Sequence, residues 1–163
     1  MDDRARKSHG RRWLFALLAV VLALGVAFVA GMWFADRGER AVAAVIESYA
    51  EAYEGLDTTK DVPVLIPLYA PDAVLRDAAT DRTYRGTGEI ESALNALLAT
   101  PDFDLTIERT LVGDGWALVF WTADGMRPGL DRVTQVDGVT SLEVSKGEIE
   151  RETWYYDPAK APF

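Results

Sequence analysis

The side chains that could carry acid–base, nucleophilic or metal chemistry are few in this sequence. Its 163 residues include no cysteine, and the single histidine, His9, lies in the basic stretch 1–12. Beyond that stretch the chain cannot form a thiol nucleophile, a Ser-His-Asp triad or a histidine-bearing zinc site. Proton transfer there has to use Asp, Glu, Tyr, Lys or water. We expect no metal and no cofactor.

One carboxylate, Asp77, is singled out by its place in a predicted strand. Within residues 73–77 it shares a face with Ala73 and Leu75. If Leu75 points to the interior, Asp77 does too, and desolvation there makes a carboxylate a stronger base. The alternative is structural: Asp77 accepts hydrogen bonds from the loop that contains Thr80.

Three stretches predict helices. In the first, apolar residues from Val42 to Leu56 recur at three- and four-residue intervals and form one stripe, which includes Tyr49 and Tyr53. The second is capped by Asp61 with Pro63 in its first turn, and Thr87 caps the third. The three helices are predicted to end at Gly55, at Pro71 and before Pro101.

Strands are predicted where the apolar pattern alternates with a period of two. The first is the short strand 73–77, which a polar loop and the third helix follow. The other four comprise residues 103–108, 116–122, 133–145 and 148–156. Gly138 marks a bulge. In the last strand Glu152, Trp154 and Tyr156 share one face, and Ile149 lies on the other. Helices followed by long strands predict an α+β fold, with the helices on one face of an antiparallel sheet.

The longest apolar stretch, residues 13–34, contains no charged or polar side chain. As a helix it would be about 33 Å long, enough to cross a hydrocarbon core of about 30 Å. Five basic residues precede it, whereas only Arg37 and Arg40 follow it before Tyr53. This asymmetry predicts a cytoplasmic N-terminus and an extracytoplasmic C-terminal domain. A cleaved signal peptide is the alternative, which the length of the stretch disfavours.

Charge divides the chain at the same place. Residues 1–12 carry a net charge of +3, whereas residues 35–163 carry 12 basic and 24 acidic side chains, a net charge of −12. Such an acidic domain repels nucleic acid and anionic lipid heads, so both are excluded as partners. We therefore predict a cytoplasmic tail (1–12), a transmembrane helix (13–34), a linker (35–40), one domain (41–158) and a C-terminal tail (159–163).

Several short motifs in this domain carry a resemblance. They are YAPDAV at residues 69–74, then Asp77, Gly86 and Ile90, and finally GEI at 147–149 and WYYDP at 154–158. Their order and spacing resemble the nuclear transport factor 2-like superfamily. The closest branch is the SnoaL-like one, which is related to polyketide cyclases and ketosteroid isomerases. The resemblance covers residues 41–158.

The resemblance implies a cone: a curved antiparallel sheet wraps around the first of three helices and leaves an apolar hollow. Asp77 then matches the general base of the ketosteroid isomerases, and Tyr49 matches their oxyanion-binding tyrosine. Where those enzymes place a protonated aspartate, this chain has Thr140, a departure that weakens the match. The resemblance also implies a homodimer through the open face of the sheet. The candidate ligand-binding residues are Tyr53, Trp121, Thr140 and Trp154; the tyrosines and tryptophans have core packing as their alternative role.

Three functions follow as hypotheses. The first is a membrane-anchored domain that binds a small apolar ligand or a protein partner in its cone. The second is a cofactor-independent isomerase, cyclase or hydrolase, with Asp77 as base and Tyr49 as hydrogen-bond donor. The third is a structural accessory of an envelope complex. Fold alone does not distinguish these functions.

Overall fold

The computed structural model describes residues 38–53, 62–126, 129 and 132–163. The predicted tail, the predicted transmembrane helix and the first residues of the linker, together residues 1–37, lie outside these ranges. Within them, no helix has the length and apolar character that crossing a bilayer requires.

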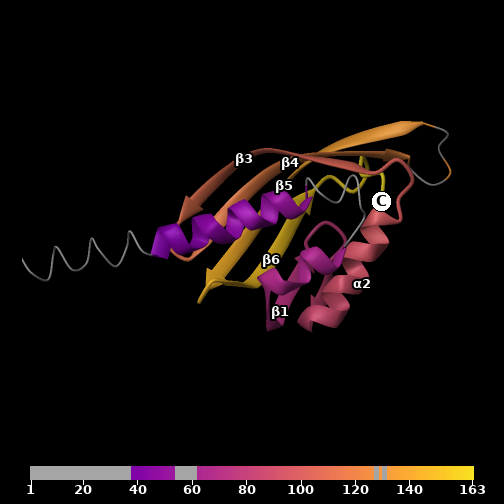
Figure 1. Ribbon diagram of the computed structural model, residues 1–163. Coiled ribbons are helices and arrows are strands. Elements are labelled where there is room, and N and C mark those ends of the chain that lie inside the picture. Colours follow the sequence, from indigo (N-terminus) through magenta and orange to yellow (C-terminus); the bar gives the residue numbers. More distant parts are fainter. Residues whose placement is uncertain (1–37, 54–61, 127–128, 130–131) are drawn as a thin grey trace, which may run out of the picture. The chain divides into compact units, whose positions relative to one another are not determined.

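The predicted α+β fold is confirmed. Six strands form one curved sheet in the order β2-β1-β6-β5-β4-β3 (Figure 1). The strands are β1 (Tyr69–Asp77), β2 (Arg82–Arg85), β3 (Asp104–Gly113), β4 (Trp116–Met126), β5 (Val133–Ser145) and β6 (Glu148–Tyr156). The prediction of a wholly antiparallel sheet is wrong in one place, because β1 and β6 pair in parallel.

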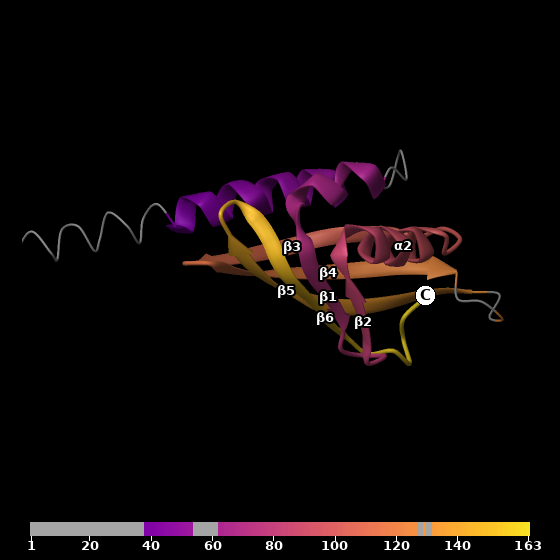
Figure 2. The ribbon, with the colours of Figure 1, turned by 90° about the horizontal axis from the view of Figure 1, so that it is seen from below.

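Two helices lie on the same face of the sheet, the helix formed by residues 38–53 and α2 (Gly86–Leu98) (Figure 2). The second predicted helix is present in a shorter form. Two 3-10 helices, Val62–Val64 and Ile66–Leu68, take the place of an α-helix, and β1 begins directly after them, before the predicted end at Pro71. Pro67 has no backbone N–H, so it cannot donate the bond to the carbonyl of Pro63 that an α-helix over this segment would need. The predicted polar loop before α2 contains the short strand β2.

The core lies between these helices and the sheet. Its fully buried side chains include Leu65, Leu75, Ile90, Leu94 and Leu142. Each contributes roughly 1.5–3 kcal/mol to folding by removal of its apolar surface from water. Leu75 lies on the inner face of β1 as predicted, with Asp77 on the same face.

The predicted bulge at Gly138 is wrong. The ladder between β4 and β5 runs without a shift, and Gly138 lies opposite Trp121. Glycine is needed there for another reason: a Cβ atom at this position would lie 2.2 Å from the Trp121 ring.

A register shift occurs instead between β5 and β6, where Val144 pairs with Ile149 and Glu143 with Arg151. Glu150 is thus the extra residue of a bulge. An extra residue reverses the alternation of side chains, so Ile149 and Glu152 are both buried, contrary to the predicted pattern.

Candidate functional site

A cavity lies between the inner face of the sheet and the two helices. It contains about 390 Å³ of space free of protein atoms, its open mouth included, but the centre of a water-sized molecule can occupy only about 20 Å³ of this. The walls therefore stand close together. The cavity is lined by Tyr49, Tyr53, Leu97, Leu105, Ile107, Val119, Trp121, Thr140, Trp154, Tyr156 and Phe163.

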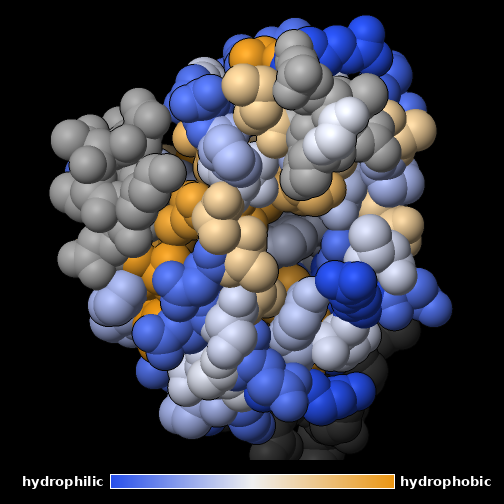
Figure 3. All heavy atoms as spheres, turned by 90° about the vertical axis from the view of Figure 1, so that its right-hand side faces the viewer, coloured by the Kyte–Doolittle hydropathy of each residue, from blue (hydrophilic) through white to orange (hydrophobic). Residues whose placement is uncertain are grey.

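The C-terminal residues narrow this cavity. The Phe163 ring contacts the edges of Tyr156 and Phe103, with ring centres 5.2 and 5.9 Å away. Pro162 before it is fully buried and packs against Gly125. In Figure 3, which views the end of the domain that carries the C-terminus, apolar residues are visible between polar ones. The mouth is therefore closed in part by a side chain that is held through ring contacts.

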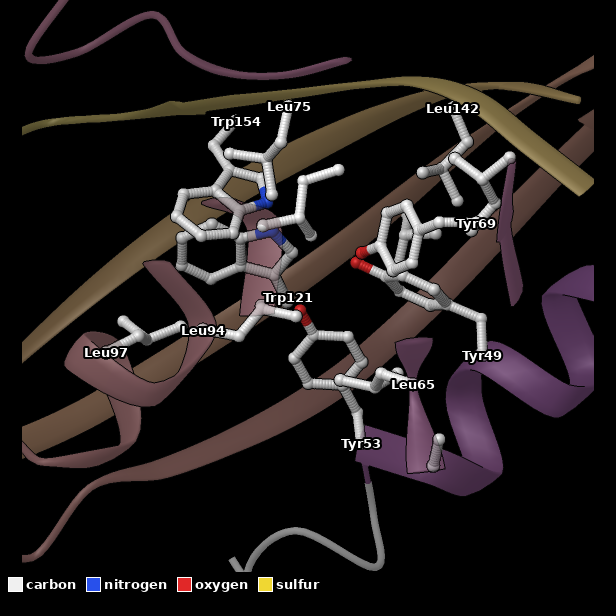
Figure 4. Close-up of a cluster of buried hydrophobic side chains, with 14 of the residues drawn as sticks. Tyr49, Tyr53, Leu65, Tyr69, Leu75, Leu94, Leu97, Trp121, Leu142 and Trp154 are labelled. Carbon is white, nitrogen blue, oxygen red and sulfur yellow. The ribbon is translucent and has the colours of Figure 1, made fainter. Parts of the chain in front are cut away.

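The four predicted ligand-binding residues, Tyr53, Trp121, Thr140 and Trp154, all line this cavity. Thr140 accepts a hydrogen bond from the indole nitrogen of Trp121, at 2.9 Å. The Tyr53 hydroxyl points toward Trp121 (Figure 4). The structure thus brings these residues together, and their part in ligand binding stays a prediction.

Among the residues that the structure describes, the most buried carboxylate is that of Glu152 on β6, a residue with no exposed surface. Tyr49 and Trp154 donate to its Oε1, at 2.7 and 2.6 Å, and Tyr69 donates to its Oε2. Figure 4 shows that the hydroxyl groups of Tyr49 and Tyr69 lie close together. Tyr49 is thus brought to the cavity wall, but its proton is directed at Glu152 and away from the cavity.

Glu152 is a residue that our sequence reasoning did not select. One signal was available, because the alternation in β6 placed it on the same face as Trp154, a predicted wall residue. A glutamate between aromatic residues on an inward face has to be paired or neutral.

Burial raises the pKa of Glu152, and the hydrogen bonds from Tyr69, Trp154 and Tyr49 oppose this increase. Burial raises the pKa of Tyr49 and Tyr69 well above the usual value, and the nearby Glu152 carboxylate raises both further. These tyrosines therefore remain protonated donors at neutral pH.

The raised pKa of Glu152 gives folding stability a defined pH dependence. A carboxyl group whose pKa is higher in the folded than in the unfolded state stabilises the fold most below its unfolded pKa of 4.5. This contribution is lost as the pH rises through the folded pKa. We therefore expect Glu152→Gln, which cannot ionise, to gain stability relative to the native chain as the pH rises from about 4 to about 8. Urea denaturation across this range tests it, and a pH-independent difference would contradict it.

Asp77 does not line the cavity. The residue is 6% exposed, and its carboxylate accepts bonds from the Ala79 N–H at 3.0 Å, the Thr80 N–H at 3.2 Å and the Thr80 hydroxyl at 2.6 Å. The fourth donor is the Tyr156 hydroxyl, at 2.8 Å. This is the structural role that we gave as an alternative, with one addition: Tyr156 is itself a wall residue.

No set of side chains suited to a metal ion occurs among the described residues. Four polar side chains of the wall donate to protein partners: Trp154 and Tyr49 to Glu152, Trp121 to Thr140, and Tyr156 to Asp77. The Tyr53 hydroxyl, a fifth, points toward Trp121. The surface of the cavity wall therefore consists mainly of ring faces and aliphatic carbons.

Comparison with solved structures shows the same fold in other proteins. A hypothetical protein with a ketosteroid isomerase-like fold from Catenulispora acidiphila, in complex with trimethylamine, has a TM-score of 0.62 and 20% identity, over 71% of this chain and 87% of that one. A nuclear transport factor 2-like protein from Burkholderia xenovorans has a TM-score of 0.60 and 15% identity, over 75% and 93% of the two chains. A protein of unknown function with a cystatin-like fold from Methylobium petroleophilum has a TM-score of 0.58 and 22% identity, over 76% and 80%.

Comparison of the sequence gives the family. No curated protein matches the chain at a significant level. The family model of the SnoaL-like domain matches residues 46–152, which is more than half of the chain and includes most of the cavity wall together with Glu152 and Asp77. The chain therefore belongs to the SnoaL-like domain family.

Proposed function

We propose that the domain binds a small, largely apolar molecule in this cavity and does no chemistry on it. The observation that carries the proposal is the direction of the polar groups. The hydrogen-bonding atoms of Tyr49, Trp121, Trp154 and Tyr156 are occupied by internal partners. Ligand pockets are typically apolar and concave with few polar groups, and this wall has that composition.

Ligand size is limited by the close walls. Phe163 is 37% exposed and has ring contacts in place of a covalent or ionic tie. Its ring can therefore move aside at modest cost, since an aromatic pair contributes about 0.5–1.5 kcal/mol. Entry of a chain as long as that of octan-1-ol therefore requires displacement of this ring.

Titration with octan-1-ol tests the proposal. We expect saturable binding, followed by isothermal titration calorimetry, and a loss of at least about tenfold in Leu105→Trp, because an indole at this half-buried wall position fills the cavity. Leu111→Trp is the matched control, since Leu111 lies on the same strand, is 46% exposed and does not line the cavity. Equal affinity of the two variants would overturn the proposal.

A second candidate function is acid–base catalysis through Asp77. The observation that favours it is the 2.8 Å hydrogen bond from Tyr156, because it links the carboxylate to the cavity wall. Tyr49, the predicted oxyanion donor, is a weaker part of this candidate because its proton is directed at Glu152.

Asp77→Asn separates the two candidates. The amide keeps one acceptor oxygen and replaces Oδ2 by a donor, so the hydroxyls of Tyr156 and Thr80 lose their acceptor and have to rotate to accept from the amide nitrogen. We expect a loss of about 1–3 kcal/mol in the free energy of unfolding, with octan-1-ol affinity changed less than about twofold. A variant as stable as the native chain would refute the structural role and favour the catalytic one.

We also propose that residues 13–34 anchor this domain to a membrane, with the N-terminus in the cytoplasm. The support is the uncharged 22-residue stretch and the excess of basic residues before it. Because the chain has no cysteine, single substitutions report sidedness. A membrane-impermeant maleimide should label Ser145→Cys in intact cells and Ser8→Cys only after lysis. Loss of the Ser8→Cys label from the purified protein would indicate a cleaved signal peptide.

A further inference from the structure

Besides Phe163, five aromatic side chains line the cavity. We call them the aromatic cage: Tyr49, Tyr53, Trp121, Trp154 and Tyr156. Tyr49 and Tyr53 come from the helix 38–53, Trp121 comes from β4, and Trp154 comes from β6 (Figure 4). These four residues are at most 9% exposed. The rings therefore surround the same space from the helix and from the sheet, with little access for bulk water.

The rings of the cage are inclined to one another. The planes of Tyr49 and Tyr53 meet at 46°, with ring centres 4.7 Å apart. Those of Trp121 and Tyr156 meet at 51°, with ring centres 6.2 Å apart. Neither pair is stacked face to face, so the rings do not cover one another's faces.

The polar hydrogens of three cage rings are directed at carboxylates that do not line the cavity. Tyr49 and Trp154 donate to Glu152, at 2.7 and 2.6 Å. Tyr156 donates to Asp77, at 2.8 Å. An aromatic ring is electron-rich on its faces and electron-poor at its edge. Because the most positive part of each edge is turned away, the rest of the ring is available to attract a cation in the cavity.

Glu152 has no cationic partner in the described part of the chain. Its three donors are neutral side chains, and the ion pairs formed between described residues involve other carboxylates. A buried carboxylate without a cationic partner is costly, and a positive charge one ring away reduces that cost. Asp77 lies opposite the exposed Arg82 in the ladder of β1 and β2, so Glu152 supplies the larger share of the attraction.

The wall also distinguishes one kind of cation from another. A primary ammonium group has three N–H donors, and the two carboxylates that can accept them lie behind the rings. Burial of such donors without acceptors is costly. Methyl groups on the nitrogen remove the donors and offer apolar surface to the ring faces. No lysine, arginine or histidine lines the cavity, and the net charge of −12 over residues 35–163 favours the approach of cations.

We infer that the ligand is a small organic cation with a methylated ammonium group, which the aromatic cage binds while Glu152 and Asp77 supply negative charge from behind the rings. The surface of such a cation is still largely apolar, because methyl carbons cover the nitrogen. This inference rests on the proposed binding function and adds the chemical class of the ligand.

Choline and 3,3-dimethylbutan-1-ol test it, since they have the same shape and differ in the charged nitrogen, which is a carbon atom in the alcohol. Calorimetry at neutral pH and low salt compares their affinities for the native chain. We expect choline to bind at least about tenfold more tightly than this neutral isostere. 2-Aminoethanol, which lacks the methyl groups, should bind at least about tenfold more weakly than choline. Equal affinities of choline and the isostere would refute the inference.

Glu152→Gln removes the negative charge behind the cage and keeps groups that can pair with its three partners. We expect the ratio of choline to isostere affinity to fall about three- to tenfold in this variant. Glu148→Gln is the matched control, since Glu148 lies on the same strand, is exposed and does not line the cavity. Its ratio should stay within about twofold of the native one. Equal falls in the two variants would overturn the assignment of Glu152.

Replacement of tryptophan by 5-fluorotryptophan adds a readout that leaves every charge and every hydrogen-bond donor in place. Fluorine withdraws electrons from the indole faces of Trp121 and Trp154 with little change in size. We expect choline to bind about two- to fivefold more weakly, and the neutral isostere to bind as before. A ratio unchanged by fluorination would contradict binding through the ring faces.

The outcomes separate the two proposals. If neither octan-1-ol nor choline binds the native chain or Phe163→Ala, in which the cavity is wider, the proposed binding function fails. If octan-1-ol binds and choline shows no preference over its isostere, the binding function stands and the cationic class of the ligand is refuted.

Discussion

Replacement of Glu152 by alanine is expected to lower the free energy of unfolding by about 3–5 kcal/mol, the largest loss for any single side chain of the site. Three donors, the hydroxyls of Tyr49 and Tyr69 and the indole N–H of Trp154, would lose their acceptor at once. The three donor residues are at most 9% exposed, so bulk water does not reach the donors, and the deleted side chain leaves a cavity beside them. Urea denaturation at neutral pH measures the loss.

Glu152→Gln is the matched control for this prediction. The amide oxygen can accept the bonds that Oε1 receives from Tyr49 and Trp154, and the amide nitrogen can donate to the Tyr69 hydroxyl after that hydroxyl rotates. We expect a cost below about 1.5 kcal/mol. If alanine and glutamine variants were equally stable, the carboxylate would have no role in holding the aromatic wall.

The network around Glu152 explains why the sequence predicted the wall and missed its support. The family resemblance selected Thr140, and Trp154 was a candidate wall residue with core packing as its alternative; both line the cavity. Hydrogen bonds between side chains that are 83 and 103 residues apart leave no local pattern. A charged residue in a strand is normally at the surface, and only its three partners make an exception of Glu152.

For Asp77, the sequence predicted the position of the side chain but not its hydrogen-bond partner. Its inward position in β1 was predicted from its neighbours Ala73 and Leu75, and its low exposure agrees. Its partner Tyr156 lies 79 residues later in the chain, so the sequence could not show whether the carboxylate would face the cavity or a hydrogen-bonding turn.

Glycine and proline positions indicated where the backbone departs from regular structure. They were less informative about which irregular conformation or contact occurs there. Pro63 and Pro67 marked a segment that we expected to be helical and that folds as two 3-10 turns. Gly138 marked an unusual position in β5, but the cause is the tryptophan ring on the neighbouring strand. A strand glycine indicates either a bulge or a close approach, and only the packing distinguishes them.

Gly138→Ala is expected to have the second largest effect, a loss of about 1–3 kcal/mol in the free energy of unfolding. The new methyl carbon would lie 2.2 Å from the Trp121 ring, so that ring has to move. Trp121 is only 6% exposed and is held by its hydrogen bond to Thr140, so the movement disrupts the cavity wall. Weaker octan-1-ol binding should accompany the loss of stability.

Gly88→Ala is the control for this change. Gly88 lies in α2, and an added Cβ there meets no atom within 4 Å. Alanine at such a helical position should be neutral or stabilise by up to about 1 kcal/mol, because it restricts the unfolded chain. Denaturation of both variants, together with the NMR signal of the Trp121 indole N–H, tests the argument. An unshifted indole signal in Gly138→Ala, with stability equal to that of the native chain, would show that Trp121 has room to yield and that the wall does not depend on this glycine.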